Sequence, residues 1–308
     1  MKAPRGIRNI SDHASSRIVA FLLKRLAQML LLSLLVTFMT FGMSSLIPGD
    51  FFSTYVITST FNSDSIDQLR HNYGLDMPFY IQYSRWLKNL LHMDLGYSLF
   101  YQRPVANVVF DALKKTLWLG MPAILLGFGL GILIGTIHGI HGERILGRFF
   151  DFLSSILLSL PSILLGLIAM LFAAHTGWFP LGGMSSSFLP DIGFWSSLAD
   201  RIHHLVLPVA CLSIPTFAYV ERTQYSSTKH GDDTPAVRFA RARGLSTSRI
   251  FIQYILRPGL NPVLSVSGPM LGGILSGSLV LEVIFAWPGL GQITYDALFN
   301  NDLFLLAG

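Results

Sequence analysis

The stretch that decides the fold is TLWLGMPAILLGFGLGILIGTI, residues 116–137, which contains no charged side chain. A helix of about 20 apolar residues crosses the ~30 Å hydrocarbon layer of a membrane. Within this stretch and just beyond it, a glycine recurs at every fourth position: Gly127, Gly131, Gly135 and Gly139. Residues four apart share a helix face, and small residues there let a second helix come close inside a membrane. We predict a spanning helix that packs on another through these four glycines.

Four more apolar runs lie elsewhere in the chain, at residues 26–47, 149–174, 204–220 and 262–286. Apolar residues make up 51% of the sequence and charged residues 13%, about half the share expected of a soluble domain. These runs predict an all-α polytopic membrane protein with five spanning helices. The first run is too long for a cleaved signal peptide, which favours an uncleaved anchor. The single cysteine, Cys211, excludes an internal disulfide and indicates no metal cluster.

The distribution of Lys and Arg predicts the orientation, because basic residues resist transfer across the membrane. Residues 1–25, 139–148 and 222–257 hold 15 of the 22 basic residues, so we assign them to the cytoplasm. The net charge of +5 follows from this asymmetry and is poor evidence for nucleic-acid binding. The predicted parts are a cytoplasmic N-terminus at 1–25, a first span at 26–47, an external segment at 48–115, and a core at 116–308 with a cytoplasmic loop at 222–258.

The external segment contains one amphipathic stretch, FYIQYSRWLKNLL at residues 79–91. Its tyrosines and leucines recur at helical spacing beside Arg85, Lys88 and Asn89. This pattern predicts a helix that lies at the membrane surface.

The cytoplasmic loop contains a basic stretch, RFARARGLSTSRI at 238–250, divided by one glycine. Residues 236–243 suit a short helix, and Gly244 suits the left-handed position that ends one. A second helix is expected to follow and to end at Pro258, whereas the polar lead-in at 226–236 predicts a loop. A basic loop of this kind could bind DNA, lipid headgroups or a cytoplasmic protein. Its tethering within about 20 residues of two spans favours protein docking over DNA reading.

The sequence contains no catalytic motif that we can identify. It lacks a Gly-x-x-x-x-Gly-Lys-Ser/Thr phosphate loop, a His-Glu-x-x-His zinc motif and a Gly-x-Ser-x-Gly elbow. His203 and His204 could be metal ligands or interfacial polar residues, and the lack of an adjacent acidic residue favours the second reading. Glu282 is also of interest, because a carboxylate in an apolar run is by default functional. It could instead reach water near the external boundary, five residues before Trp287.

Four stretches of the chain resemble one family of membrane proteins. Ala240-Arg241-Ala242-x-Gly244-Leu245, followed by Leu256 and Asn261-Pro262, looks like the EAA-type coupling loop of ABC importer permeases in the dipeptide, oligopeptide and nickel branch. The other stretches that fit this branch are LIPGD at 46–50, YGLDMPFYIQYSRWL to DLGYSL at 73–99 with Arg103-Pro104-Val105, and LEVIFAWPGLG at 281–291. The block at 73–105 resembles the "B"-type subunit of the two permeases in such systems.

The resemblance implies a type I importer permease in the bacterial inner membrane. Such a permease works with a second homologous permease, two cytoplasmic ATPases and an external solute-binding protein. ATP and Mg then bind to the ATPases, so no cofactor, no enzymatic activity and no nucleic-acid partner are expected of this chain. Peptides are the expected substrates, ahead of nickel or other small solutes.

The resemblance also implies roles for two groups of residues. Those expected to couple to the ATPases are Ala240, Arg241, Ala242, Gly244, Leu245 and Arg249. Those expected at the external mouth are Glu282, Trp287, Pro288, Gly289 and Gly291. A structural or gating contact between permease subunits is the favoured role for Glu282, and substrate binding is a third option. A bulky residue such as Asp in place of Gly244 is expected to uncouple transport while leaving membrane insertion intact.

Two features depart from the family pattern. The lead-in at 226–236 is polar where family members usually continue a helix, and the chain stops at LFLLAG, where similar permeases begin a sixth span. The sixth span is therefore expected to be missing, as in a truncated chain or gene fragment. Two rival classes are a stand-alone channel or secondary transporter, which needs polar residues deep in several helices, and an intramembrane hydrolase, which needs a paired nucleophile and base.

Overall fold

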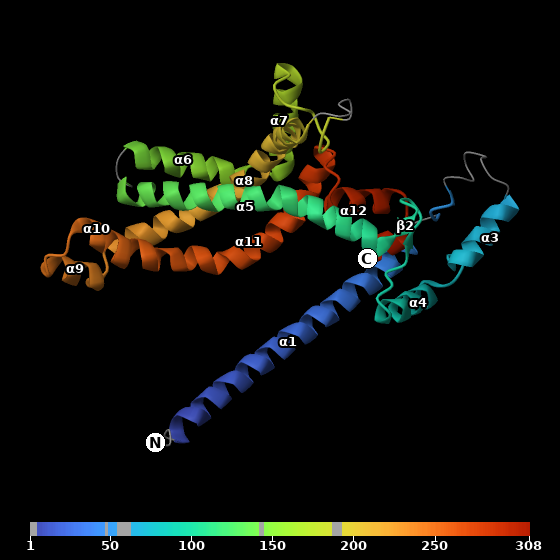
Figure 1. The fold of residues 1–308 in the computed structure, drawn as a ribbon, viewed down its shortest axis with the longest axis horizontal. Helices are drawn as coiled ribbons and strands as arrows, with labels where there is room; N and C mark the ends of the chain where they lie inside the picture. Colours follow the sequence, from blue (N-terminus) through green and yellow to red (C-terminus); the bar gives the residue numbers. More distant parts are fainter. Residues whose placement is uncertain (1–4, 47–48, 54–62, 142–144, 187–192) are drawn as a thin grey trace. The chain divides into compact units, whose positions relative to one another are not determined.

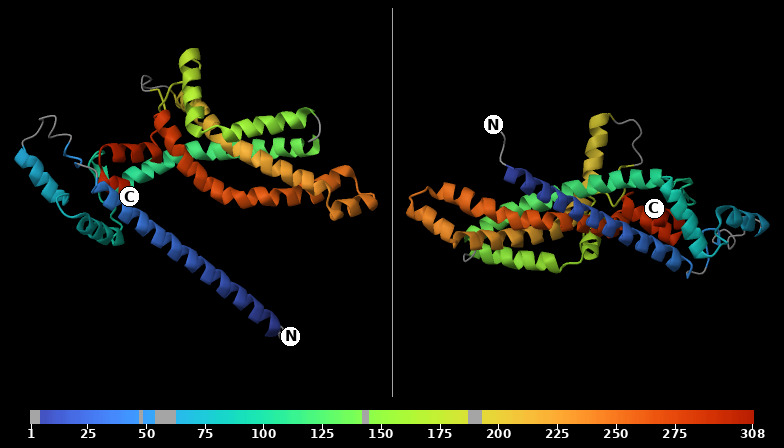
Figure 2. Two further views of the ribbon diagram at one scale, coloured as in Figure 1. Left: turned by 180° about the vertical axis from the view of Figure 1, so that it is seen from behind. Right: turned by 90° about the horizontal axis from the view of Figure 1, so that it is seen from below.

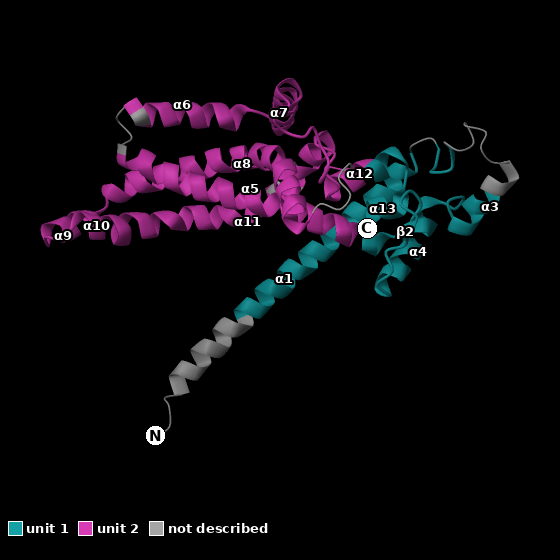
Figure 3. Cartoon of the chain, turned by 45° about the horizontal axis from the view of Figure 1, so that its top comes forward, with its two compact units in different colours: residues 1–107, 296–308 teal, residues 108–295 magenta. Residues whose placement is uncertain are grey.

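The computed structural model describes residues 5–46, 49–53, 63–141, 145–186 and 193–308, most of them helical (Figure 1). Parts of the segments named above lie outside these residues: 1–4 of the N-terminus, Ile47 and Pro48 of LIPGD, 54–62 of the external segment, 142–144 of the basic segment at 139–148, and 187–192 of the core. The chain forms two compact units, residues 1–107 with 296–308 and residues 108–295 (Figure 3). The last residues of the predicted core therefore fold with the N-terminal part of the chain.

The first unit is built on the long helix α1 (Arg5–Ser44), which begins inside the predicted cytoplasmic N-terminus. Its part from Arg17 to Ser44 is long and apolar enough to cross a membrane. The amphipathic helix is present as α4 (Phe79–Leu91). Trp86 of α4 is buried beside Phe41 of α1, with ring centroids 5.7 Å apart, so α4 packs on α1. The other elements of this unit are α3 (Ser63–Tyr73), β1 (Tyr97–Ser98), β2 (Arg103–Pro104) and α13 (Leu303–Ala307).

Asp302 joins the last helix of the first unit to the antiparallel hairpin of β1 and β2. Its buried carboxylate accepts hydrogen bonds from Ser98 Oγ at 2.6 Å and from Phe100 N at 3.0 Å. The same side chain caps α13 by accepting from Leu305 N. Because a buried carboxylate without partners is costly, these three donors fix α13 on the hairpin.

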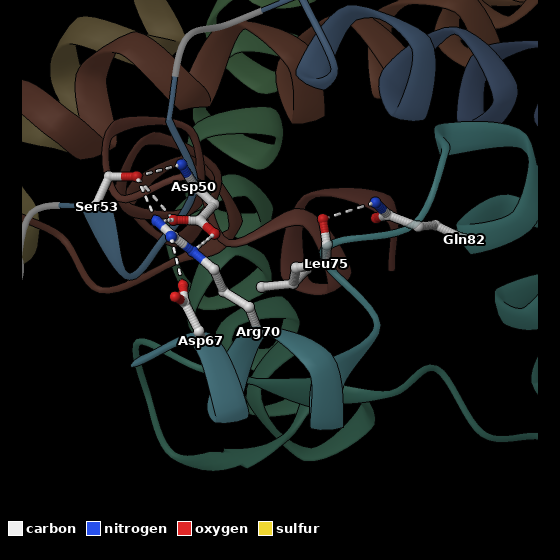
Figure 4. A network of polar contacts seen from close by, with 6 residues as sticks. All are labelled: Asp50, Ser53, Asp67, Arg70, Leu75 and Gln82. Atoms are coloured by element: carbon white, nitrogen blue, oxygen red, sulfur yellow. Dashed lines mark hydrogen bonds and ion pairs between the residues drawn. The ribbon is translucent and has the colours of Figure 1, made fainter. Parts of the chain in front are cut away.

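An ion pair ties α3 to the segment that follows α1 (Figure 4). Arg70 contacts both carboxylate oxygens of Asp50, through Nε at 2.7 Å and Nη2 at 3.0 Å. Burial by itself raises the pKa of Asp50, but the hydrogen bonds from Arg70 and Ser53 and the guanidinium charge outweigh it and hold this pKa below its usual 3.8. The carboxylate is therefore held in its charged form.

The second unit is a bundle of long helices. Its elements are α5 (Val105–His141), α6 (Ile145–Ser159), α7 (Ser162–Thr176), α8 (Phe194–Asp232), α11 (Arg257–Ile284) and α12 (Leu290–Phe299). Residues 105–107 of α5 and 296–299 of α12 are counted with the first unit. Helix α8 contacts α6, α7 and α11, and most of it lies beside α6 and α11 in views from opposite sides (Figures 1 and 2). A buried apolar cluster lies where α5, α7, α8 and α11 meet and includes Leu119, Leu165, Leu212, Leu281 and Phe285.

The four glycines of the predicted helix face lie against α8. A Cβ atom added at Gly127, Gly131 or Gly139 would come within 2.8, 2.7 or 2.5 Å of a side-chain Cβ of α8, and one at Gly135 would collide with a backbone oxygen. Their partners on α8 are Thr216, Val220, Thr228 and Glu221. Helices α5 and α8 can come this close only because no side chain stands between them.

The described residues contain three helices long and apolar enough to span a membrane, or up to five spans if each of two bent helix pairs is counted as one. The upper number equals that of the five predicted runs, but the run at 149–174 is not one straight helix. Helices α6 and α7 meet at 99°. Pro161 has extended backbone angles and no N–H to donate, so the helix stops there instead of only bending.

The prediction of a loop at 226–236 is wrong, because α8 continues to Asp232. Thr228 is buried against Gly139 and Gly231 lies near Ile255, so packing outweighs the low helix propensity of this polar segment. Pro258 does not end a helix either. The chain stays helical from α10 (Thr247–Ile250) through the π-helical segment η1 (Phe251–Leu256) into α11. Pro258 lies in the first turn of α11, where a missing N–H is tolerated.

Candidate functional site

The loop predicted to be cytoplasmic forms a tight elbow after α8. Thr234 caps α9 (Pro235–Ala242) by accepting from Val237 N, and Pro235 occupies the first turn. The helix ends in a Schellman motif: Gly244 N donates to Arg241 O at 2.9 Å and Leu245 N donates to Ala240 O at 3.3 Å. Gly244 has φ = +72°, the left-handed conformation that the sequence predicts.

One face of the elbow is buried in its own small core. This core consists of Val237, Ala240, Ile250 and Ile255, with Leu245, Phe251 and Tyr254 packed at its edge. Ala240 is therefore turned away from solvent and Leu245 is half-buried. Among the residues expected to couple to the ATPases, these two shape the elbow from inside, whereas Arg241, Ala242, Gly244 and Arg249 are exposed.

Phe239 is an exposed aromatic residue of α9 that none of the sequence motifs indicated. Its side chain is 69% exposed, on the face opposite the buried Val237 and Ala240. A helical projection of residues 236–243 could have found it, because Phe239 is the large apolar residue off the Val237–Ala240 side. An exposed aromatic ring on a short helix is a typical anchor for a partner protein.

Arg241 has a partner within the chain. Its Nη2 lies 2.5 Å from Asp232 Oδ1 at the end of α8, and both side chains are about half exposed. An exposed ion pair of this kind contributes at most about 1 kcal/mol. Its effect here is geometric, since it links the last turn of α8 to α9.

Glu282 is fully buried near the end of α11, so the alternative that it reaches water is wrong. Its Oε2 accepts a hydrogen bond from Gly291 N at 2.6 Å, while Oε1 has no hydrogen-bond partner among the described residues. A Cβ at Gly289 would lie 2.5 Å from Oε2, and one at Gly291 would collide with the backbone of Leu279, so neither position has room for a side chain unless its neighbours shift. The carboxylate therefore fills the inside of the turn between α11 and α12.

Trp287 fixes the same turn to α5. Its buried indole Nε1 donates to Lys115 O at 2.9 Å, and Leu290 N donates to Thr116 Oγ1 at 2.8 Å. Pro288 is half-buried between them. The five residues expected at the external mouth thus form one turn, whose described contacts lie inside this chain. A contact of Glu282 with another subunit stays a prediction.

The two groups of site residues lie far apart, at opposite ends of α11 (Figure 1). This helix has 28 residues, so it extends about 42 Å at 1.5 Å per residue. His203 and His204 belong to neither group. His204 is buried with Nδ1 at 2.9 Å from Asp200 O, and the described residues contain no cluster of three or more His, Cys, Asp or Glu that could hold a metal ion.

The chain that forms this bundle, elbow and turn matches a known family of membrane proteins. Residues 127–308 match the family described as "Binding-protein-dependent transport system inner membrane component", and residues 18–120 match the N-terminal region of such membrane components. The chain belongs to this family. It is therefore a multi-pass membrane protein of the ABC importer permease class.

Several known proteins are similar to this permease over nearly its full length. A peptide transport system permease protein of Brucella suis biovar 1 (strain 1330) is 32% identical over 294 residues, which cover 94% of this chain and 90% of that protein. Oligopeptide transport system permease protein AppB of Bacillus subtilis (strain 168) is 30% identical over 285 residues, covering 92% and 88%. A solved structure of the MetNI methionine ABC transporter has a TM-score of 0.48 and 16% identity over 65% of the permease and 87% of that chain, which is too distant to add to the assignment.

Proposed function

We propose that this permease is one half of the membrane pathway of an ATP-driven, binding-protein-dependent importer of dipeptides or oligopeptides. The relatives named for peptide and oligopeptide transport support the substrate class. The basic residues support a location in the bacterial inner membrane with the N-terminus and the α9 elbow in the cytoplasm. The second half is a homologous permease, and an external solute-binding protein delivers the substrate.

The observation that carries the proposal is the elbow at Gly244. Helix α9 is capped at both ends, packs one face on the small core of the elbow and is linked to α8 through Asp232. It can therefore move as a rigid body. Phe239 and the exposed arginines of the outer face supply the aromatic and cationic side chains with which a cytoplasmic ATPase docks. Closure of two ATPases on ATP and Mg would displace the elbow and, through α8 and α11, alternate access to the pathway. In this scheme the permease holds no cofactor, catalyses no reaction and binds no nucleic acid.

The test is reconstitution of the permease with its partner permease, the ATPases and the binding protein in liposomes. ATP-dependent uptake of a radiolabelled dipeptide or pentapeptide is expected, and it should vanish when the ATPases are left out. Uptake without the ATPases would support a stand-alone transporter and overturn the proposal. If the complex took up 63Ni²⁺ but neither peptide, the protein would still be an importer permease, but its substrate would be nickel instead of peptides.

A further inference from the structure

Three helices of the second unit meet at one buried carboxylate, that of Glu221 on α8. Glu221 Oε1 lies 2.6 Å from His138 Nδ1 of α5, and Oε2 accepts a hydrogen bond from Ser154 Oγ of α6. All three side chains are at most 2% exposed. Nothing in the sequence pairs these three residues, because each lies near the end of a different apolar run.

The surroundings of the cluster restrict its movement. The His138 ring stacks on Tyr225 of α8, with centroids 3.8 Å apart and planes 12° from parallel. Gly135 of α5 touches the backbone of Glu221 itself, so the two helices are in contact at this level. Next to it, Arg222 Nη1 donates to Ser155 Oγ at 3.0 Å, which is a second link between α8 and α6.

The arrangement does not suit catalysis. Ser154 bonds the carboxylate and not the imidazole, so the order is serine–glutamate–histidine instead of the serine–histidine–carboxylate order that activates a nucleophile. His138 Nε2 makes no hydrogen bond within the described part of the chain, and the nearest carboxylate, Asp151, is 3.7 Å away. A buried, partnered charge is weak evidence for stability but fixes one arrangement of the helices around it.

We propose that Glu221 is a positioning residue that makes α5 and α6 move together with α8. Glu221 lies 11 residues before the end of α8 at Asp232, or about 16 Å along the helix, and α9 follows directly. A displacement of the elbow reaches Glu221 along one continuous helix, and the carboxylate passes it to His138 and Ser154. This inference rests on the proposed function, since it assigns a residue through which ATPase movement reaches α5 and α6.

The test compares four variants in the reconstituted complex by the number of peptides transported per ATP hydrolysed. Glu221→Ala removes both links and is expected to lower this ratio about fivefold while ATP hydrolysis continues, as for mutations within coupling networks. Glu221→Gln retains the volume, an acceptor for Ser154 and a polar atom facing His138, so it should restore most of the ratio. Ser154→Ala removes only the link to α6 and should lower the transport ratio less than Glu221→Ala does. It also tests the inference if Glu221→Ala fails to assemble, because the ratio of Ser154→Ala should still fall below that of the wild type. Thr223→Ala is the matched control, because its hydroxyl bonds the Tyr219 carbonyl of the same helix.

A distance measurement tests the inference without reference to the solute. In a Cys211→Ser background, spin labels at the exposed Arg148 of α6 and Arg243 of the elbow report whether α6 follows α8. On addition of ATP and vanadate to the complex, their separation should stay constant with Glu221 and change with Glu221→Ala.

An unchanged transport ratio in Ser154→Ala and Glu221→Ala, or an unchanged label separation in Glu221→Ala, would overturn the inference. If neither the wild type nor Thr223→Ala transported peptide, the result would instead count against the proposed function.

Discussion

Gly244 shows how a single residue sets the shape of the elbow. Its φ of +72° is the left-handed conformation that ends α9, yet an added Cβ would meet nothing within 4 Å in the described chain. The requirement at this position is therefore conformational and not one of space inside the chain. Glu282 shows the opposite case, because its carboxylate fills a turn whose two glycines leave room for nothing else.

Replacing Gly244 by Val should therefore affect coupling more than replacing it by Asn. A β-branched residue in this conformation costs about 1–2 kcal/mol, whereas Asn tolerates it. We expect Gly244→Val to lower ATP-dependent uptake severalfold with unchanged amounts of protein in the membrane, and Gly244→Asn, like the bulky Asp considered above, to lower it less than Val does. Equal loss in both variants would mean that the size of the side chain matters, through contact with the ATPase.

Glu282→Ala should destabilise the second unit. It leaves Gly291 N–H buried without an acceptor, at a cost of about 1–3 kcal/mol, and Glu282→Gln keeps an amide oxygen in the same place. Thermal unfolding of the purified permease in detergent measures both, and the drop in Tm should be clearly larger for Ala. If Glu282→Gln were as unstable as Glu282→Ala, the hydrogen bond to Gly291 would not be the reason for a carboxylate here.

Single elements of this permease owe their positions to a few polar contacts and to one exposed ring. Helix α3 is held by Arg70, α13 by Asp302 and α9 by Thr234 and Asp232. The outer face of α9 presents Phe239, which nothing in the described chain covers. Removal of one of these polar contacts is expected to lower the stability of the fold, whereas removal of the exposed ring is expected to weaken binding of a partner.

The Asp50–Arg70 pair predicts a dependence of stability on pH. The pKa of Asp50 is lower in the folded chain than its usual 3.8, so its contribution is complete above pH 3.8 and is lost as the pH falls through the lower folded value. The pair is about a quarter to a third exposed, which limits its worth to about 1 kcal/mol. Wild type should therefore unfold at a slightly higher temperature than Arg70→Met at pH 7, with the difference shrinking below pH 3.8. A constant difference at all pH values would argue against the ion pair.

Phe239→Ala should weaken the association of α9 with the ATPases. Loss of an exposed aromatic anchor from an interface costs about 2 kcal/mol, or roughly thirtyfold in affinity. Co-purification and ATPase binding in nanodiscs measure this loss. Ile252→Ala is the matched control, since Ile252 is an apolar residue of η1, 57% exposed and outside α9. Equal weakening by both variants would mean that the docking surface is not α9.

At the scale of the whole molecule, the basic segments predict which ends of the spans face the cytoplasm. In a Cys211→Ser background, Arg243→Cys should react with an impermeant maleimide only in inverted vesicles, and His92→Cys only in intact spheroplasts. Both side chains are exposed, so access to the reagent depends on the side of the membrane. Labelling of Arg243→Cys from outside would reverse the proposed topology and remove the basis for ATPase docking.

The helical nature of the apolar runs, the bounds of α4, the glycine contact and the turn at Gly244 could be predicted from the sequence, because each depends on local spacing or backbone preference. Hydrophobic length determines which segments can enter a membrane, and four-residue glycine spacing determines which helix face can take a neighbour. Tertiary packing decided the rest. It kept 226–232 helical against Gly139 and Ile255, buried Glu282 inside a turn and brought Glu221, His138 and Ser154 together. The physical reason is that burial and pairing between distant segments outweigh the small local propensities that a sequence pattern records.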